Sequence, residues 1–111
     1  MPPLPNADRA LIDPRKITDY LLSPTHRFGA AKAAFFASFG FSARDWQTLK
    51  DALLAHASAH AIDRQFSTAF GEVYELVGPL ATPDGRNPTV LVAWMVRNGE
   101  DFPRFVTAVP A

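Results

Sequence analysis

The sequence predicts an α+β domain in which N-terminal helices pack on a C-terminal antiparallel β-meander of three to four strands. Apolar residues recur with the 3.6-residue helical period up to about residue 60, and the composition becomes strand-like from about residue 66. With 111 residues, 48% of them hydrophobic, the chain is long enough for one modest core. We therefore expect a single domain over 1–111, with an extended arm at 1–8, a helical layer at 13–60 and an antiparallel sheet at 66–110.

The first helix is predicted to begin at Asp13 and Pro14, because an acceptor side chain followed by proline is a typical helix start. It should end near Pro24. Lys16 and Tyr20 are four residues apart in this helix, so we expect them to be neighbours on one face.

A second helix is predicted from about Phe28 to Phe39, with Gly40 as its C-terminal stop. Lys32 falls on the apolar side of this helix, because Phe28, Phe35 and Phe39 share its face. We expect the stem of Lys32 to cover apolar surface and its ammonium to emerge at a rim or a pocket.

Ser42 is the predicted cap of a third helix, whose apolar stripe continues to His56 and His60. Two histidines at positions i and i+4 can chelate a metal, but this pair lacks the glutamate that a zinc protease uses as its base. The pair also prolongs the core stripe, so we expect it to form a half-buried end of that stripe. We predict no metal site and no cofactor.

Three stretches rich in Val, Phe, Tyr and Trp predict strands, and strong turn signals at 83–86 and 98–101 separate them. These stretches are 70–77, 89–96 and 102–109. Strict alternation in the last one places Arg104 and Val106 on one side and Phe105 and Thr107 on the other, unless a bulge near Pro103 changes the order. The planar fork of Arg104 is suited to phosphate, and a surface ion pair with Glu72 or Glu75 is the alternative interpretation.

Composition limits the possible functions. The chain has 11 basic and 11 acidic residues, which argues against a general nucleic-acid coat. Residues 1–32 hold five basic and three acidic residues, whereas 33–111 hold six and eight, so a mild positive field lies near the start. No cysteine is present, which fits a cytoplasmic protein, and neither a signal peptide nor a membrane span is predicted.

The segment from His26 through Gly29 to Lys32 combines a group that titrates near neutrality with a fixed cation. This pair is suited to work on a phosphodiester. The alternative is a loop histidine beside a lysine that only covers apolar surface.

The ordered motifs of the chain resemble an uncharacterised bacterial domain family. Its members occur as small stand-alone proteins and as C-terminal modules of large polymorphic toxins, and the family is similar to the barnase/EndoU/colicin/RelE-like ribonuclease-toxin group. The motifs are Asp13 to Leu22, His26…Gly29…Lys32, Phe36…Gly40, Tyr74…Gly78-Pro79-Leu80, Asp84-Gly85-Arg86, Trp94 and Pro103 to Ala108 with Pro110. The chain departs from the family pattern at Arg27 and Phe28, after the histidine, and at Val109, where relatives often have tyrosine.

The resemblance implies a metal-independent endoribonuclease that cleaves RNA by transesterification of the 2′-hydroxyl. It also implies a small cognate antitoxin or immunity protein as a partner, and no role for a membrane. The implied catalytic residues are His26, Lys32, Arg104 and Thr107, and the implied substrate-binding residues are Lys16, Tyr20 and Tyr74. The alternative is a non-enzymatic protein that binds a partner on a degenerate toxin fold.

Overall fold

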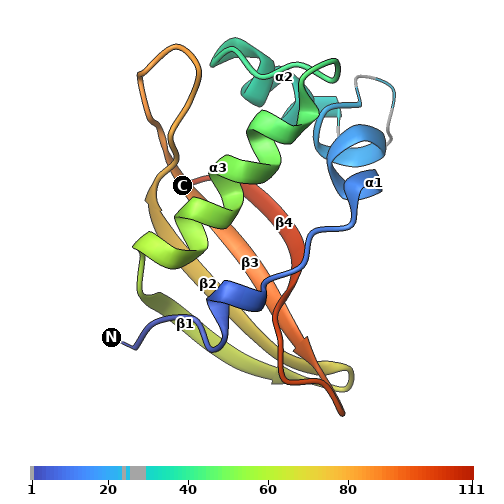
Figure 1. The fold of residues 1–111 in the computed structure, drawn as a ribbon, viewed down its shortest axis with the longest axis vertical. Helices are drawn as coiled ribbons and strands as arrows, with labels where there is room; N and C mark the ends of the chain where they lie inside the picture. Colours follow the sequence, from blue (N-terminus) through green and yellow to red (C-terminus); the bar gives the residue numbers. More distant parts are fainter. Residues whose placement is uncertain (1, 24, 26–29) are drawn as a thin grey trace.

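A computed structural model describes residues 2–23, 25 and 30–111. It has N-terminal helices followed by a four-stranded antiparallel sheet with strand order β1-β2-β3-β4, so the predicted fold class is confirmed (Figure 1). The elements are η1 (Ala7–Arg9), α1 (Pro14–Lys16), η2 (Ile17–Leu21), α2 (Ala30–Ser38), α3 (Trp46–Ala59), β1 (Ile62–Thr68), β2 (Gly71–Pro79), β3 (Thr89–Arg97) and β4 (Arg104–Pro110). None of the helices in the described part of the chain has the length and apolar content needed to cross a membrane.

The first strand, β1, starts four residues earlier than the sheet predicted at 66–110. Its sequence gives little strand signal because Asp63, Arg64 and Gln65 are polar and exposed, as is common at the edge of a sheet. An irregularity between Ile62 and Arg64 further disturbs the alternation on which sequence analysis relies.

The N-terminal arm is extended only in part. Pro2 accepts a hydrogen bond from the backbone N–H of Ile62 at 2.9 Å, so the arm begins along the edge of β1. The short 3-10 helix η1 interrupts it. Further on, Leu11 forms an isolated parallel bridge with Arg104, which attaches the arm to the opposite edge of the sheet.

The predicted start of the first helix is confirmed. The carboxylate of Asp13 accepts a hydrogen bond from the Arg15 backbone N–H at 3.0 Å, and Pro14 is the first helical residue. The helix then widens into the π-helical turn η2, in which Leu22 N–H donates to Ile17 C=O at 2.9 Å. Ile17 and Leu21 are fully buried, so this turn is fixed against the core, and its Tyr20 reaches Thr107 of β4.

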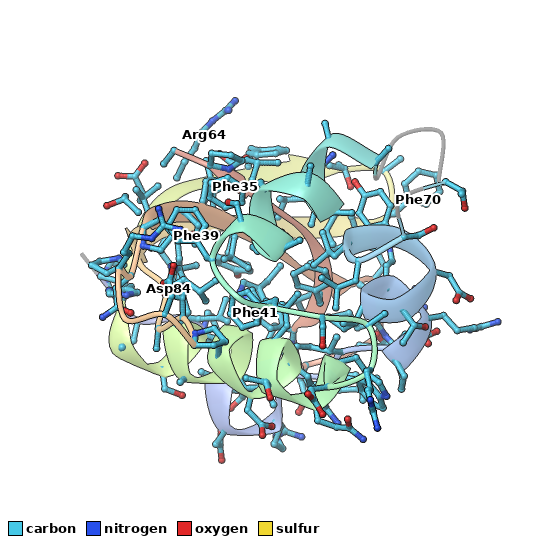
Figure 2. The ribbon with its side chains drawn as sticks, turned by 90° about the horizontal axis from the view of Figure 1, so that it is seen from above. Phe35, Phe39, Phe41, Arg64, Phe70 and Asp84 are labelled. Atoms are coloured by element: carbon cyan, nitrogen blue, oxygen red, sulfur yellow. The ribbon has the colours of Figure 1, made fainter. Side chains whose placement is uncertain are left out.

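Helix α2 packs through a slightly different face from the predicted one. Ala33 and Phe36 are buried, whereas Phe35 and Phe39 lie half-buried at the margin (Figure 2). The loop between β2 and β3 holds the end of this helix. Arg86 donates to the carbonyl of Ser38 at 2.5 Å and lies 4.3 Å from the ring centroid of Phe39. The helix that carries Lys32 is therefore anchored at its C-terminal end.

Helix α3 lies across one face of the sheet, which we call the inner face (Figure 1). Leu49 and Leu53 are fully buried there, in one apolar cluster with Trp94 of β3. This confirms the predicted apolar stripe. Trp94 packs edge-on against Phe105 of β4 at a centroid distance of 5.6 Å, which joins the last strand to the core.

A β-bulge in β4 changes the predicted facing of its residues. Ala93 is opposite Thr107 and Trp94 is opposite Phe105, so Val106 is the extra residue. Phe105 and Ala108 therefore both face the inner side and are buried. Arg104 and Thr107 share the outer face, which corrects the alternation that placed them on opposite sides.

Gly71 gives a test of this packing. Its φ is 153°, and a Cβ at this position would lie 2.1 Å from the carbonyl oxygen of Val96. We expect Gly71→Ala to lower the free energy of unfolding by about 2 kcal/mol or more, because the backbone of β3 must move. Chemical denaturation measures this. Gly99→Asn, in an open turn with φ 82°, should change stability by less than about 1 kcal/mol. Equal losses for the two variants would contradict the close approach of β2 and β3.

Candidate functional site

A groove of about 700 Å³ lies between the first helical segment and the edge strand β4. We call it the η2–β4 groove. It is lined by Asp13, Arg15, Lys16, Asp19, Tyr20, Val106 and Thr107. The bulge in β4 helps to form it, because the carbonyl of Val106 accepts a hydrogen bond from the Lys16 ammonium at 3.4 Å.

Tyr20 lies at the centre of the contacts in this groove. Its hydroxyl and the hydroxyl of Thr107 are 3.2 Å apart and share a hydrogen bond. The Lys16 Nζ lies 5.8 Å and the Lys32 Nζ 5.2 Å from the ring centroid. Two ammonium groups over the ring occupy space that a stacked base would need. The groove therefore offers a ligand the hydroxyl of Tyr20 rather than its ring face.

The surroundings of Tyr20 make its hydroxyl more acidic. Partial burial alone raises the pKa of Tyr20, but hydrogen bonds from Thr107 and Lys32 and the positive charges of Lys32 and Lys16 outweigh burial, and the pKa falls below 10. A hydroxyl that releases a proton more easily, beside two cations, can act in proton transfer near an anion.

Two carboxylates also line the groove. Asp13 forms an ion pair with Arg15, with 3.0 Å between Nη2 and Oδ2, and these hydrogen bonds lower the pKa of Asp13. Asp19 accepts a hydrogen bond from the hydroxyl of Thr18 at 3.1 Å. The charge of Asp13 is thus balanced locally by Arg15, whereas Asp19 adds a negative charge to the lining. The cations nearest the Tyr20 ring are the ammonium groups of Lys16 and Lys32.

Arg104 shares the outer face with Thr107 but does not line the groove. Its guanidinium makes two hydrogen bonds to the carboxylate of Glu100, at 2.8 and 2.9 Å. Arg104 therefore forms an ion pair, as the alternative interpretation predicted, but its partner is Glu100 rather than Glu72 or Glu75. Lys32 lies over the ring of Tyr20, whose hydroxyl bonds to Thr107, whereas Arg104 lies outside this groove and does not share a cleft with Lys32.

Another predicted site residue, Tyr74, is not brought to this groove. Tyr74 is 9% exposed and lies in the apolar cluster on the inner face, opposite Trp94. His26 lies outside the described residues. Of the seven predicted side chains, the structure brings together Lys16, Tyr20, Lys32 and Thr107.

A second groove, of about 560 Å³, was not predicted from the sequence and lies at the C-terminal end of β3. We call it the hairpin groove. It is lined by Ala69, Phe70, Met95, Arg97 and Asn98. Phe70 was expected to begin a strand, but it lies in the turn before β2 and is 74% exposed (Figure 2). The glycine after Phe70 could have indicated this exposed position, because an aromatic residue beside a glycine in a turn need not point inward.

The histidine pair joins α3 to the end of β2. Nε2 of His56 lies 3.2 Å from the carbonyl of Gly78, and Nε2 of His60 lies 2.9 Å from the carbonyl of Pro79. The rings meet edge to face at 4.4 Å. Both Nε2 atoms are thus directed at backbone oxygens, and the part of the chain described here contains no cluster of three or more potential metal ligands.

Comparison with known proteins gives a family and a fold. The sequence model of a family described as "Domain of unknown function (DUF6883)" matches residues 3–111. No protein of curated function matches the chain. A solved chain from a contact-dependent growth inhibition toxin–immunity protein complex of Klebsiella pneumoniae 342 is similar in structure, with a TM-score of 0.70 and 17% identity. The similarity covers 90% of this chain and 98% of that one, and it establishes a shared fold.

The buried His56 predicts a pH dependence of stability. Burial, and secondarily the charge of His60, lower its pKa from 6.5 to about 4. The unfolded chain therefore takes up this proton first as the pH falls, and stability is lost between about pH 6.5 and 4. We expect a loss of about 2–3 kcal/mol from this group at ~1.4 kcal/mol per pKa unit.

Denaturation of the wild type and of His56→Gln at pH 7.5 and pH 4.5 measures this contribution. The carboxylates titrate in both proteins, so the difference between the two proteins in how unfolding free energy changes with pH reports the contribution of His56. The wild type should lose more stability than the variant. Parallel slopes would contradict a buried, neutral His56.

Proposed function

We propose that this chain, which belongs to the DUF6883 family, is a toxin-type, metal-independent endoribonuclease. It would act in the cytoplasm as one member of a toxin–antitoxin or toxin–immunity pair. The main support is the hydroxyl of Tyr20, which is polarised by Thr107 and Lys32 beside a second ammonium, that of Lys16. Cleavage of RNA without a metal requires such a combination of cations and proton-transfer groups around one phosphate.

In the proposed reaction, the 2′-oxygen of a ribose attacks the adjacent phosphorus and the bond from phosphorus to the 5′-oxygen breaks. A 2′,3′-cyclic phosphate forms, and the leaving 5′-oxygen takes the proton of the Tyr20 hydroxyl. Lys16 and Lys32 stabilise the charge that develops on the phosphoryl oxygens, and Thr107 orients Tyr20. The proton of the 2′-hydroxyl passes to a base, for which His26 is our candidate on sequence grounds.

Arg104 and Tyr74 have other roles in this proposal. Arg104 lies along the outer face beyond Thr107 and is held by Glu100, so it would contact the RNA backbone rather than the reacting phosphate. Tyr74 supports the inner face on which the helices pack.

A second candidate function is the binding of a partner protein without catalysis. The observation that favours it is the fold shared with a chain of a toxin–immunity protein complex, together with a net charge of zero. The cognate partner would be a small antitoxin or immunity protein. A test for RNA cleavage that depends on the groove residues distinguishes the two candidate functions.

Purified wild-type protein should cleave single-stranded RNA in the presence of EDTA and leave 2′,3′-cyclic phosphate ends. Tyr20→Phe and Lys32→Ala should each lower the rate roughly 10²- to 10³-fold, because one removes the proton donor and the other a cation at the phosphate. Lys50→Ala is the matched control, since Lys50 also lies over an aromatic ring, 6.0 Å from the centroid of Trp46, but on α3.

The pH profile gives an independent test of Tyr20. A general acid must be protonated, so the wild-type rate should fall as the pH rises through the lowered pKa of Tyr20. The variant Tyr20→Phe should lack this alkaline decline. Growth arrest on induction that survives both Tyr20→Phe and Lys32→Ala, without RNA cleavage, would favour the partner-binding alternative.

A further inference from the structure

The turn between β1 and β2 presents Phe70 to solvent in a fixed position. The backbone N–H of Phe70 donates to the hydroxyl of Thr68 at 3.1 Å, and its carbonyl accepts from the N–H of Asn98 at 2.9 Å. The side-chain amide of Asn98 also donates to the carbonyl of Ala69 at 2.8 Å. Two turns are thus tied together, and the backbone that carries Phe70, a residue that is 74% exposed, is fixed by hydrogen bonds.

The hairpin groove beside Phe70 is cationic. Arg97, which is exposed, lines the groove together with Phe70 and Met95. The two carboxylates of the neighbouring turn are engaged elsewhere, Glu100 by Arg104 and Asp101 by Arg9 at 2.9 Å. An exposed aromatic ring beside a guanidinium can stack a nucleobase and contact its phosphate.

The outer face connects the hairpin groove to the η2–β4 groove. Thr107 is opposite Ala93 and Arg104 is opposite Met95, and Arg97 follows on the same face of β3. From Ala93 to Arg97 this path is about 14 Å long at ~3.4 Å per residue. Arg104 adds an aromatic–cation pair on the way, with its guanidinium 5.0 Å from the ring centroid of Phe102 and bound to Glu100.

We propose that the outer face of β3 and β4 carries a track for single-stranded RNA, which runs from the η2–β4 groove to the hairpin groove. Phe70 stacks a base at the far end of this track and Arg97 binds a phosphate there. This proposal rests on the proposed ribonuclease function. It implies that the substrate is unpaired RNA several nucleotides long. Duplex RNA is a poor fit, because its bases are not available to a stacking ring.

Binding of fluorescent, uniformly 2′-O-methyl RNA tests the track without cleavage, because the attacking hydroxyl is blocked. With an oligonucleotide of about twelve residues, Phe70→Leu should weaken binding about 5- to 100-fold, the range of one lost base stack. Phe70→Trp should bind at least as tightly as the wild type. Leucine keeps an apolar side chain but lacks the π face, so full binding by Phe70→Leu overturns the stacking assignment and favours an apolar contact with a protein.

Arg97→Ala tests the phosphate contact. It should reduce the slope of log affinity against log salt by about 0.7, the value expected for one phosphate of a single strand. Arg44→Ala, an exposed arginine in the connection between α2 and α3, should leave the slope unchanged. An unchanged slope for Arg97→Ala, or equal affinity of the wild type for duplex and single strand, overturns the track.

The outcomes for the track and for the ribonuclease are separable. Phe70-dependent binding of RNA by a protein that cleaves nothing would leave the track in place and remove the proposed catalysis. Cleavage that depends on Tyr20, with Phe70→Leu binding as the wild type does, would keep the catalysis and remove the track. The melting temperature of each variant excludes a loss of binding through unfolding.

Discussion

The β-bulge at Val106 is the constraint on which the rest of the structure depends. Without the extra residue, Phe105 and Ala108 could not both face the inner side, and the core would lose one of its two contacts with the edge strand. The same bulge places Thr107 on the outer face with Arg104. It also leaves the carbonyl of Val106 directed at Lys16, so one backbone irregularity sets both the core and the groove.

The first helical segment supplies the other half of the groove, and its position follows from burial rather than from polar contacts. Ile17 and Leu21 are fully buried, and the wide π-helical turn between them carries Tyr20 toward β4. Each fully buried side chain of this kind contributes about 1.5–3 kcal/mol. Exposed ion pairs such as Arg15–Asp13 contribute far less. The apolar residues therefore hold in place the polar group that we propose for chemistry.

The α+β order, the Asp13 cap and the apolar stripe of α3 could be predicted from the sequence, because each depends on a local pattern. The facing of the β4 residues could not be predicted, because the bulge lies at Val106 rather than near Pro103 and leaves no mark on the alternation of side chains. The resemblance also implied a binding role for Tyr74, but this tyrosine occupies an inner-facing strand position and belongs to the core. The ion pair of Arg104 with Glu100 depends on the turn between β3 and β4, and nothing in the spacing favoured Glu100 over Glu72 or Glu75.

A net charge of zero fits the proposed function once the charges are placed in space. Carboxylates in several turns form ion pairs with arginines that are close in space, as in Asp84 with Arg86 and Asp101 with Arg9. Lys16 and Lys32 instead converge on one aromatic ring. Screening limits the reach of exposed charges to about 8–10 Å at physiological salt. The field at a phosphate in the groove therefore depends on the charges around it, which are Lys16, Lys32, Arg15, Asp13 and Asp19, and not on the sum over the chain. A neutral domain can thus hold an anion at one place without binding nucleic acid everywhere.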